Sequence, residues 1–477
     1  MSGKPEEGGL SRRGFLKGAA LAAAGPWVLP SWVLGMNGRT APSDRITTAY
    51  VGNGRWGGDV HVAQDALRDD IEVLAVCDVR RDRREMAKKR VEGAYAERRR
   101  VSQHGGVRAY NDFREILARP DVDAVVILTP HYWHAVMGIM AAQAGKHIYV
   151  EKMYATTLGE AQALAQAAKR HGIVSQHGTQ GRSMATFRHA TELAQNGRTG
   201  KILRVEATCL DGCGTIAPGQ RRPLGAGTST AREVPVPEGL DWDLYLGPCP
   251  WKPYTGDLND VGGFGFSMLA DFGIHPMDSA QMILDVRDSR PIEVYPGGTG
   301  GYDKVTIRYA SGAEVTRPPG RGSWGDDAEF GDFGVRVIGS EGAIAVDRNG
   351  CHVHPAHLDR RPVGPDDWRY NPNAADPVAR AASAVVASNS RGSVGFQDSW
   401  AGVGAHKSNW FHSIRTGQRT NAHEDHARRS ASACILIHMA YALGRPLKWD
   451  PQREEFVGDD EANRLRDYPK RAPWQVY

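Results

Sequence analysis

The sequence predicts an α/β domain followed by a mixed α+β domain, and three observations support this fold class. Over residues 45–180, short apolar runs alternate with helical stretches, which is typical of a parallel sheet covered by helices. Beyond this part the strand-like runs lengthen and read as antiparallel strands, at residues 202–209, 305–309 and 334–339. Residues 424–443 then read as a long helix that ends at a glycine.

The first βαβ unit carries a glycine motif. Residues 45–51 and 71–77 read as strands, the second ending on Asp78, and a helix begins near residue 60. The motif between strand and helix comprises Gly52, Asn53, Gly54, Arg55, Trp56 and Gly57. In such a unit the first glycine permits a tight turn, the second admits a pyrophosphate, and the third lets the helix pack closely. With the helix N-terminus facing the phosphates and Asp78 accepting from a ribose hydroxyl, the unit predicts dinucleotide binding.

The remaining elements follow from the same patterns. Further strands are expected at residues 122–129, 147–150 and 173–176, with helices at 135–144 and 158–170. Stretches rich in glycine, proline or serine are expected to be loops, at residues 211–239, 288–302, 317–333 and 352–399.

Three short motifs carry residues suited to alcohol chemistry. The first contains Thr129, Pro130, Trp133 and His134, the second Glu151 and Lys152, and the third Asp271 and His275. Asp271 and His275 are four residues apart, so on a helix they share a face, and the carboxylate would raise the basicity of the imidazole. A buried Lys152 would stabilise an alkoxide while His275 receives the hydroxyl proton. Each motif alone also has a structural interpretation, such as an exposed Glu151–Lys152 ion pair.

Residues 1–43 resemble an export signal. Arg12 and Arg13 precede an apolar stretch at residues 19–34, as in a twin-arginine signal. A membrane anchor is the alternative, although a glycine and two prolines interrupt a run that barely reaches the roughly 20 residues a span needs. Twin-arginine export carries folded proteins, so we expect a tightly bound cofactor, recycled in place. The expected location is periplasmic, or membrane-attached outside the cytoplasm.

Composition narrows the class of protein. The 477 residues are 41% hydrophobic and 24% charged, with a net charge of +4, which is ordinary for a globular chain. The arginines near residues 80–90 and 98–100 read as solvated faces, so no nucleic-acid partner is expected. The six cysteines contain no Cys-x-x-Cys pair, so no metal site is expected. After residue 44 no apolar run is long enough for stable membrane insertion.

Taken in order, these motifs resemble the Gfo/Idh/MocA oxidoreductases, a family named for glucose–fructose oxidoreductase and inositol dehydrogenase. The resemblance extends over the chain after the signal and includes residues 241–248. It implies a Rossmann domain at residues 44–180 and a C-terminal domain at residues 181–477. The second domain would hold a large, open, mostly antiparallel sheet, through which family members form homo-oligomers, here a dimer or tetramer.

The resemblance also assigns roles to residues. It implies catalytic roles for Lys152, Asp271 and His275. The residues expected to bind the cofactor are Gly52, Asn53, Gly54, Arg55, Trp56, Gly57, Asp78, Thr129, Pro130, Trp133, His134, Glu151 and Lys152. Candidates for contacting a sugar are His177, Gln180 and Arg182. Asp78 should repel a 2′-phosphate and favour NAD, although nearby arginines leave NADP open.

One residue departs from the family pattern. Met153 stands where the family has a proline after Glu-Lys. That proline shapes the turn that presents the lysine, often through a cis peptide bond. The substitution could therefore move the lysine or slow the reaction.

Three functions remain open from the sequence. The first is an NAD(P)-dependent oxidoreductase acting on a sugar, polyol or sugar derivative. The second is an NAD-dependent glycoside hydrolase that uses transient oxidation and elimination; the retained Lys152 disfavours it, because such hydrolases tend to lose this lysine. The third is a cofactor-bound sugar-binding or scaffold protein without turnover. The intact Lys152, Asp271 and His275 disfavour it, whereas Met153 keeps it open.

Overall fold

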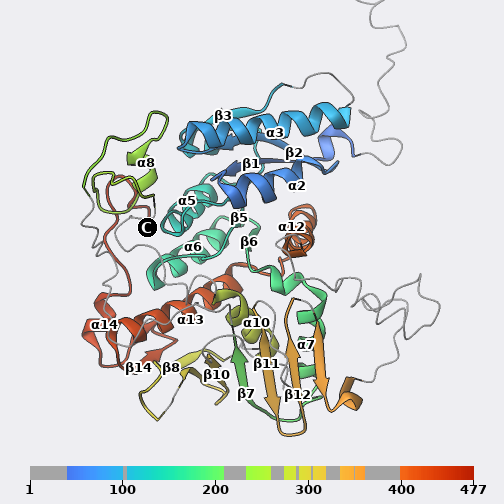
Figure 1. The fold of residues 1–477 in the computed structure, drawn as a ribbon, viewed down its shortest axis with the longest axis vertical. Coiled ribbons are helices and arrows are strands. Elements are labelled where there is room, and N and C mark those ends of the chain that lie inside the picture. The colour runs from blue at the N-terminus through green and yellow to red at the C-terminus, as the bar shows by residue number, and fades with distance from the viewer. Residues whose placement is uncertain are drawn as a thin grey trace, which may run out of the picture. The chain divides into compact units, whose positions relative to one another are not determined.

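The computed structural model describes residues 40–99, 105–208, 232–258, 273–285, 289–301, 304–317, 333–348, 350–359 and 398–477. The chain divides into two units, residues 1–45 and residues 46–477. Of the first unit, the described part contains one 3-10 turn, η1 (Pro42–Asp44). The twin-arginine signal and Asp271 lie outside the described residues. The second unit holds both sheets (Figure 1).

A six-stranded parallel sheet forms the first part of the second unit. Its strands are β1 (Ile46–Val51), β2 (Ile71–Cys77), β3 (Arg108–Tyr110), β4 (Ala124–Ile127), β5 (His147–Val150) and β6 (Ser175–His177). Their spatial order is β3-β2-β1-β4-β5-β6. This is the strand order of the dinucleotide-binding Rossmann fold, so that prediction is confirmed. The order reverses between β1 and β4, where such sheets open a crevice for ligands.

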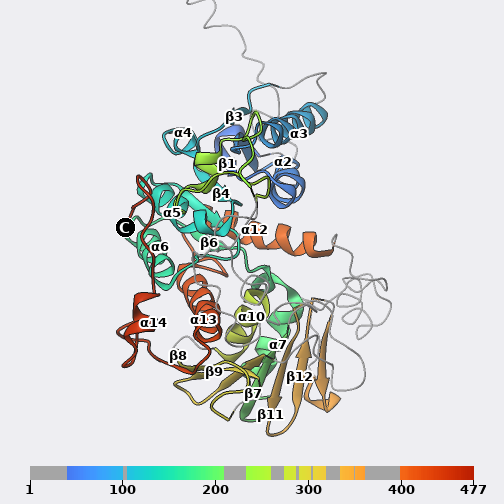
Figure 2. The same cartoon turned by 60° about the vertical axis from the view of Figure 1, so that its left-hand side comes forward.

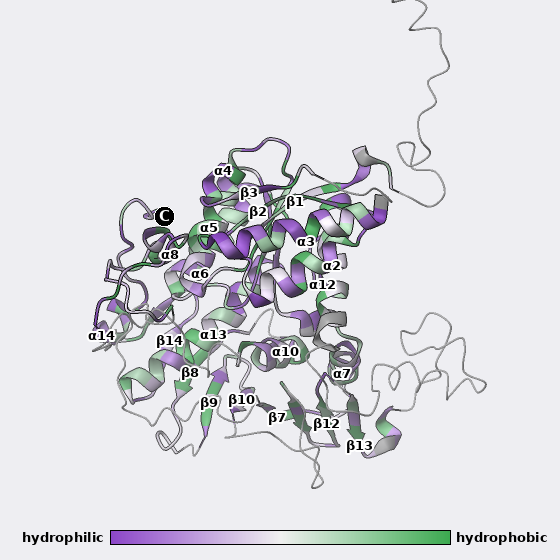
Figure 3. Cartoon of the chain, turned by 45° about the horizontal axis from the view of Figure 1, so that its top comes forward, coloured by the Kyte–Doolittle hydropathy of each residue, from purple (hydrophilic) through white to green (hydrophobic). Residues whose placement is uncertain are grey.

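Helices cover both faces of this sheet. They are the π-helical turn η2 (Gly57–Val62), α2 (Ala63–Ala66), α3 (Arg81–Arg99), α4 (Phe113–Leu117), α5 (His131–Gln143), α6 (Leu158–Arg170) and α12 (Asp398–Thr416). Side chains of β1 alternate between the two faces: Ala49 and Val51 pack with α4, α5 and α6, whereas Ile46 and Tyr50 pack with α2, α3 and α12. In Figure 3, hydrophilic residues predominate along α3. A helix from the end of the chain therefore completes the N-terminal domain.

A nine-stranded sheet forms the second domain. Its strands are β7 (Ile202–Ala207), β8 (Pro291–Tyr295), β9 (Val305–Tyr309), β10 (Glu314–Arg317), β11 (Val335–Gly339), β12 (Ala343–Val346), β13 (Cys351–His354), β14 (Leu447–Asp450) and β15 (Glu455–Phe456), in the spatial order β13-β12-β11-β7-β10-β9-β8-β14-β15. Only the β7–β10 pair among these described strands is parallel. The prediction of a mostly antiparallel second sheet is therefore confirmed.

Helices of the second domain pack against one face of this sheet (Figure 2). The other elements of this domain are η3 (Gln180–Ser183), α7 (Ala185–Gln195), α8 (Trp242–Leu246), α10 (Ile274–Leu284), η4 (Ala356–Asp359), α13 (Glu424–Leu443) and α14 (Asp460–Arg464). Helices α7, α10 and α13 contact the strands, whereas α8 lies with the first domain (Figure 1). In the described part of the chain, no helix combines the length and apolar character required to cross a membrane.

Two predicted loops contain strands. Residues 288–302 include β8, which pairs with β9 and β14, and residues 352–399 include most of β13, which pairs with β12. The loop predictions were wrong there because glycines and prolines next to these strands dominated the pattern. Pro291 is the first residue of β8, a position that strands tolerate.

Candidate functional site

The glycines of the turn after β1 differ in the space around them. A Cβ on Gly57 would lie 2.0 Å from the carbonyl oxygen of Gly52, and one on Gly52 would lie 2.6 Å from the backbone of Leu128. Gly52 also has φ +90°, which disfavours any other residue. A Cβ on Gly54 would meet no protein atom within 4 Å, because Gly54 faces a cavity. Two glycines thus close the turn, and the third leaves room for a ligand.

Asp78 lies at the carboxyl end of β2 and braces the same turn. Its carboxylate accepts the N–H of Asn53 at 2.7 Å and that of Arg80 at 2.9 Å. Burial raises the pKa of the Asp78 carboxyl, and the N–H groups of Arg80 and Asn53 partly oppose that effect. The carboxyl group lines the cavity, where its remaining acceptor positions can meet a ribose hydroxyl.

The cavity between these residues has a volume of about 370 Å³. The described residues that line it are Val51, Gly52, Gly54, Arg55, Trp56, Gly57, Cys77, Asp78, Val79, Arg80, Arg83, Asn111, Phe113, Leu128, Thr129, Pro130, Trp133, Met137, Leu244, Tyr245 and Leu258. Its place at the β1–β4 reversal, the open space at Gly54 and the Asp78 carboxyl together fit the adenosine and pyrophosphate of a dinucleotide.

A segment of the second domain covers this cavity. Helix α8 returns to the first domain, where the N–H of Asp241 donates to the carbonyl of Val79 at 3.0 Å. Leu244 and Tyr245 line the cavity, and Nε1 of Trp133 donates to the carbonyl of Leu244 at 3.0 Å. We call residues 239–248 the α8 cap. It gives the cavity a wall that the Rossmann domain alone lacks.

The C-terminal residues hold the α8 cap. Nε of Arg471 donates to the carbonyl of Gly247 at 2.9 Å, and the N–H of Arg471 donates to that of Pro248 at 3.0 Å. The ring of Trp474 packs edge-on against Trp133, with 4.7 Å between the ring centroids. The end of the chain therefore supports both the cap and the aromatic wall of the cavity.

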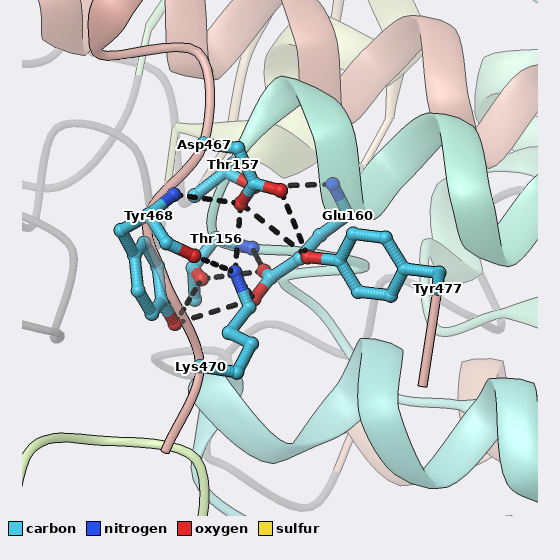
Figure 4. A network of polar contacts seen from close by, with 7 residues as sticks. All are labelled: Thr156, Thr157, Glu160, Asp467, Tyr468, Lys470 and Tyr477. Carbon is cyan, nitrogen blue, oxygen red and sulfur yellow. Dashed lines mark hydrogen bonds and ion pairs between the residues drawn. The ribbon is translucent and has the colours of Figure 1, made fainter. Parts of the chain in front are cut away.

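A buried polar network fixes this end of the chain to α6 (Figure 4). Nζ of Lys470 lies 3.1 Å from Oε1 of Glu160 and donates to Asp467 at 2.7 Å. The hydroxyl groups of Tyr468 and Thr156 donate to Glu160 at 3.2 Å and 2.5 Å. Because Glu160 is fully buried and each of its oxygens has a partner, the network favours one docked position for residues 465–477.

Glu151 and Lys152 follow β5, and neither is among the described residues that line the cavity. Glu151 is buried, so the interpretation as an exposed ion pair was wrong. Its Oε1 accepts from Nε2 of Gln180 at 2.8 Å and lies 3.5 Å from Nε2 of His61, while its Oε2 accepts the N–H of Lys152 at 3.0 Å. Burial opposes ionisation, but His61 and Lys152 outweigh it and hold the pKa of Glu151 well below its usual range. The Lys152–Met153 peptide bond is cis.

His275 lies within the electrostatic reach of this pair. Burial, followed by the positive charges of Arg348 and Lys152, lowers the pKa of His275 well below its usual value, while Glu151 raises it. Burial also lowers the pKa of His177 to about 3. Both imidazoles are therefore neutral at pH 7, and His275 can accept a proton beside an ionised Glu151 and the ammonium group of Lys152.

The comparisons with known proteins agree with this geometry. Residues 46–179 match the oxidoreductase family with an NAD-binding Rossmann fold, and residues 199–323 and 398–476 match its C-terminal alpha/beta domain. The chain belongs to the Gfo/Idh/MocA oxidoreductase family. The chain is thus an NAD-binding oxidoreductase by family membership.

Individual relatives differ in activity. The chain is 30% identical to myo-inositol 2-dehydrogenase of Thermotoga maritima over 62% of this chain and 74% of that protein. It is 25% identical to D-glucoside 3-dehydrogenase of Escherichia coli, over 66% and 79%. A glycosyl hydrolase family 109 protein of Shewanella baltica is 31% identical, but over only 34% of this chain and 37% of that protein. An oxidoreductase domain protein from Kribbella flavida shares the fold, with TM-score 0.53 and 19% identity over 84% and 98%.

Two residues predicted to bind the cofactor are buried in the protein and do not face the cavity. Asn53 is buried, and its side chain donates to the carbonyl of Cys77 at 2.8 Å. His134 is fully buried between the carbonyls of Met153 and Thr129, at 2.6 and 2.8 Å from its ring nitrogens. Neither residue is among the described residues of the cavity wall. They position the loops on which cofactor-facing residues lie.

The three candidates for sugar contact lie in different surroundings. Gln180 binds Glu151, and Nε of Arg182 makes a buried ion pair with Asp278 at 2.8 Å. The ring nitrogens of His177 are buried, and no described residue forms a hydrogen bond with them. Of the three side chains, that of His177 has two ring nitrogens that can form hydrogen bonds with a sugar, because no described residue binds them.

Sequence reasoning missed the polar residues beneath the site. His61 lies in the turn after the glycine motif, and Lys407, fully buried on α12, donates to its carbonyl at 3.1 Å and to Asp65. The signal for His61 was a single histidine in an otherwise apolar helix start. Nothing local marks Lys407, since its partners lie more than 300 residues earlier.

One described group has the composition of a cation site. Ligand atoms of His423, Glu424 and Asp425 lie within 4.8 Å of one another. Both carboxylates, however, form ion pairs with Arg419, at 2.6 and 2.8 Å. The group therefore has a structural partner already, and it lies apart from the cavity lining.

Proposed function

We propose that the chain is an NAD-dependent oxidoreductase that oxidises a secondary alcohol of a sugar, polyol or sugar derivative. The observation that carries the proposal is the electrostatic group of Lys152, ionised Glu151 and neutral His275 in a chain whose cavity fits the adenosine and pyrophosphate of a dinucleotide. The dehydrogenases of inositol and of D-glucosides among the relatives support this substrate class.

The residues divide the chemistry as follows. Bound NAD would accept the hydride from the alcohol carbon. Lys152 would hold the substrate oxygen and stabilise its negative charge as the proton leaves. We assign that proton to the imidazole of His275, which burial keeps neutral and therefore able to accept it. Glu151 would help to hold Lys152 in place.

We also propose NAD rather than NADP. Arg80 and Arg81 left NADP open, but both have carboxylate partners: Arg80 pairs with Asp82 at 2.7 Å and Arg81 with Glu238 at 3.0 Å. Asp78 lies where a 2′-phosphate would have to fit. Equilibrium binding of the two cofactors tests this, and tighter binding of NADP contradicts it.

Tight retention of the cofactor and export are further parts of the proposal. The α8 cap and the docked C-terminal residues support retention, and the twin-arginine pattern at Arg12 and Arg13 supports export with the cofactor bound. Replacing both arginines with lysine should leave the protein in the cytoplasm. Assembly as a homo-oligomer through the second sheet is tested by light scattering.

The decisive experiment identifies the cofactor and the substrate together. The protein is purified without added cofactor, denatured, and any released dinucleotide is identified by mass. The native protein is then mixed with a panel of sugars and polyols, and reduction of bound cofactor is followed at about 340 nm. Stoichiometric NAD that one sugar reduces supports the proposal; an empty protein that binds NAD weakly contradicts retention.

A glycoside hydrolase remains the second candidate, because glycosyl hydrolase family 109 proteins match part of the chain. It predicts bound NAD that no free sugar reduces and cleavage of an aryl glycoside without net redox change. The oxidoreductase predicts the reverse result on both substrates.

A further inference from the structure

A second cavity, of about 510 Å³, lies within the C-terminal domain, among η3, α7, α10 and the start of α13. These helices lie side by side over the nine-stranded sheet (Figure 1). The described residues that line the cavity are Arg182, Arg188, Gln195, Gln281, Met282, Asp285, Asn421, His426 and Arg429. None of them lines the dinucleotide cavity. We call it the arginine cavity.

The arginine cavity has an excess of positive charge. Three of its described lining residues are arginines, of which Arg188 is exposed, and one, Asp285, carries a carboxylate. Arg182 is compensated by its buried ion pair with Asp278. The side chains of Arg188 and Arg429, in contrast, form no ion pair or hydrogen bond with any described residue. The charge of these two groups therefore lacks a partner within the described protein.

The surroundings of Arg429 make this charge costly. Burial and the positive charges of Arg182 and Arg290 lower the pKa of Arg429, and only Asp425 opposes them among its leading neighbours. Asp425 is itself paired with Lys169 and Arg419. An anion in the cavity would relieve this repulsion.

The other polar groups of the cavity suit hydroxyl groups. The amide nitrogen of Asn421 donates to Ser183 at 3.0 Å, and that of Gln195 donates to the carbonyl of Met282 at 2.9 Å. The two amide oxygens, for which the described residues supply no donor, can accept hydrogen bonds. Burial lowers the pKa of His426 to about 2, so its neutral ring can donate as well as accept.

We propose that the arginine cavity binds a small hydroxylated oxyanion, a compound with a phosphate or carboxylate group. Guanidinium groups match both oxyanions with paired hydrogen bonds. The volume is within the range of small-molecule sites, about 300–1,000 Å³. The site is separate from the dinucleotide cavity and its occupancy does not depend on the proposed oxidoreductase activity.

The test is calorimetric titration of the full-length, NAD-saturated protein. The probes are inorganic phosphate and D-gluconate, with D-glucose as the neutral control. Phosphate or gluconate should bind, and Arg429→Gln or Arg188→Gln should weaken that binding about tenfold, as expected for losing a charged hydrogen bond. Arg429→Lys should retain part of it. The exposed Arg453→Gln change removes the same charge elsewhere and should have no effect.

Each outcome decides a point. Tighter binding of phosphate identifies the phosphate class, and tighter binding of gluconate the carboxylate class. Anion binding that neither glutamine variant weakens overturns the proposal, as does a heat from D-glucose that Arg429→Gln abolishes equally. If the oxidoreductase proposal is wrong, no sugar or polyol reduces the bound NAD, but the anion still binds to the arginine cavity. The two failures are therefore distinguishable. Thermal unfolding and NAD affinity of each variant show that it is folded.

Discussion

Two glycines of the turn after β1 have different roles: Gly57 permits close packing, and Gly54 leaves space for the ligand. Alanine substitutions at the two positions distinguish these roles. Gly57→Ala would place a Cβ 2.0 Å from the carbonyl oxygen of Gly52, so the turn must shift and Tm should fall. Gly54→Ala meets no protein atom within 4 Å, but its methyl group enters the cavity. Gly54→Ala should therefore weaken NAD binding at unchanged Tm. Equal loss of Tm in both variants would contradict this division.

Lys152 supports a second residue-scale prediction. Lys152→Met removes the charge proposed to stabilise the alkoxide and should lower the rate of cofactor reduction about 10²–10³-fold. NAD should remain bound, because the cavity lining does not include Lys152. The control is Lys448→Met on β14, an exposed position in the second sheet. Stopped-flow absorbance gives the rate. An unchanged rate for Lys152→Met would show that Lys152 has no catalytic role.

At the scale of single elements, local signals located the glycine turn and the strand end at Asp78, whose residues line the cavity, but they also selected Asn53, His134, Glu151 and Lys152, which are not among its described lining residues. The glycine motif, Asp78 and the turn after β5 are read from strand, turn and helix patterns within about 30 residues. The α8 cap could not be predicted in this way, because its partners, such as Val79 and Trp133, lie more than 100 residues earlier. Strand β8 was predicted as a loop for a different reason, because the glycines next to it in the sequence are typical of loops.

The α8 cap leads to a prediction about cofactor release. Arg471→Gln removes the charged contacts to Gly247 and to Asp243. The cap should then open more easily, and NAD should dissociate about tenfold faster, which corresponds to about 1.4 kcal/mol. The rate of hydride transfer with NAD bound should change little.

The control for this change is Arg445→Gln. It removes an arginine that pairs with Asp459 and Glu461, in the same C-terminal region but away from the cap. Release of NAD is followed by its displacement with a fluorescent analogue. If both variants release NAD at the wild-type rate, the cap does not retain the cofactor.

At the scale of the whole molecule, the chain repeatedly returns to its N-terminal domain. Residues of α12 complete the core on one face of β1, the α8 cap forms part of the cavity wall, and Trp474 packs against Trp133 of that wall. Buried histidines lie where these returning segments meet the first domain. Nε2 of His406, on α12, faces the carbonyl of His177 at 2.8 Å, and both rings are fully buried. Folding should therefore depend on these rings being neutral.

The pH dependence of stability follows from these two histidines. Burial lowers the pKa of His177 to about 3 and that of His406 to about 4, against about 6.5 in the unfolded chain. Below pH 6.5 the unfolded chain binds more protons than the folded one. The free energy of unfolding should fall with pH by about 1.4 kcal/mol per unit for each histidine, until pH approaches 4.

A matched pair of variants isolates this effect. His177→Gln replaces a buried titrating ring with a neutral amide, so its Tm should fall less between pH 7.5 and 5 than that of the wild type. His412→Gln, at an exposed position on α12, should retain the wild-type fall. Calorimetry at several pH values gives both slopes, and their difference is independent of other titrating groups. A slope that His177→Gln leaves unchanged would mean that His177 titrates alike in the folded and unfolded chains, and the lowered pKa assigned to it would be wrong.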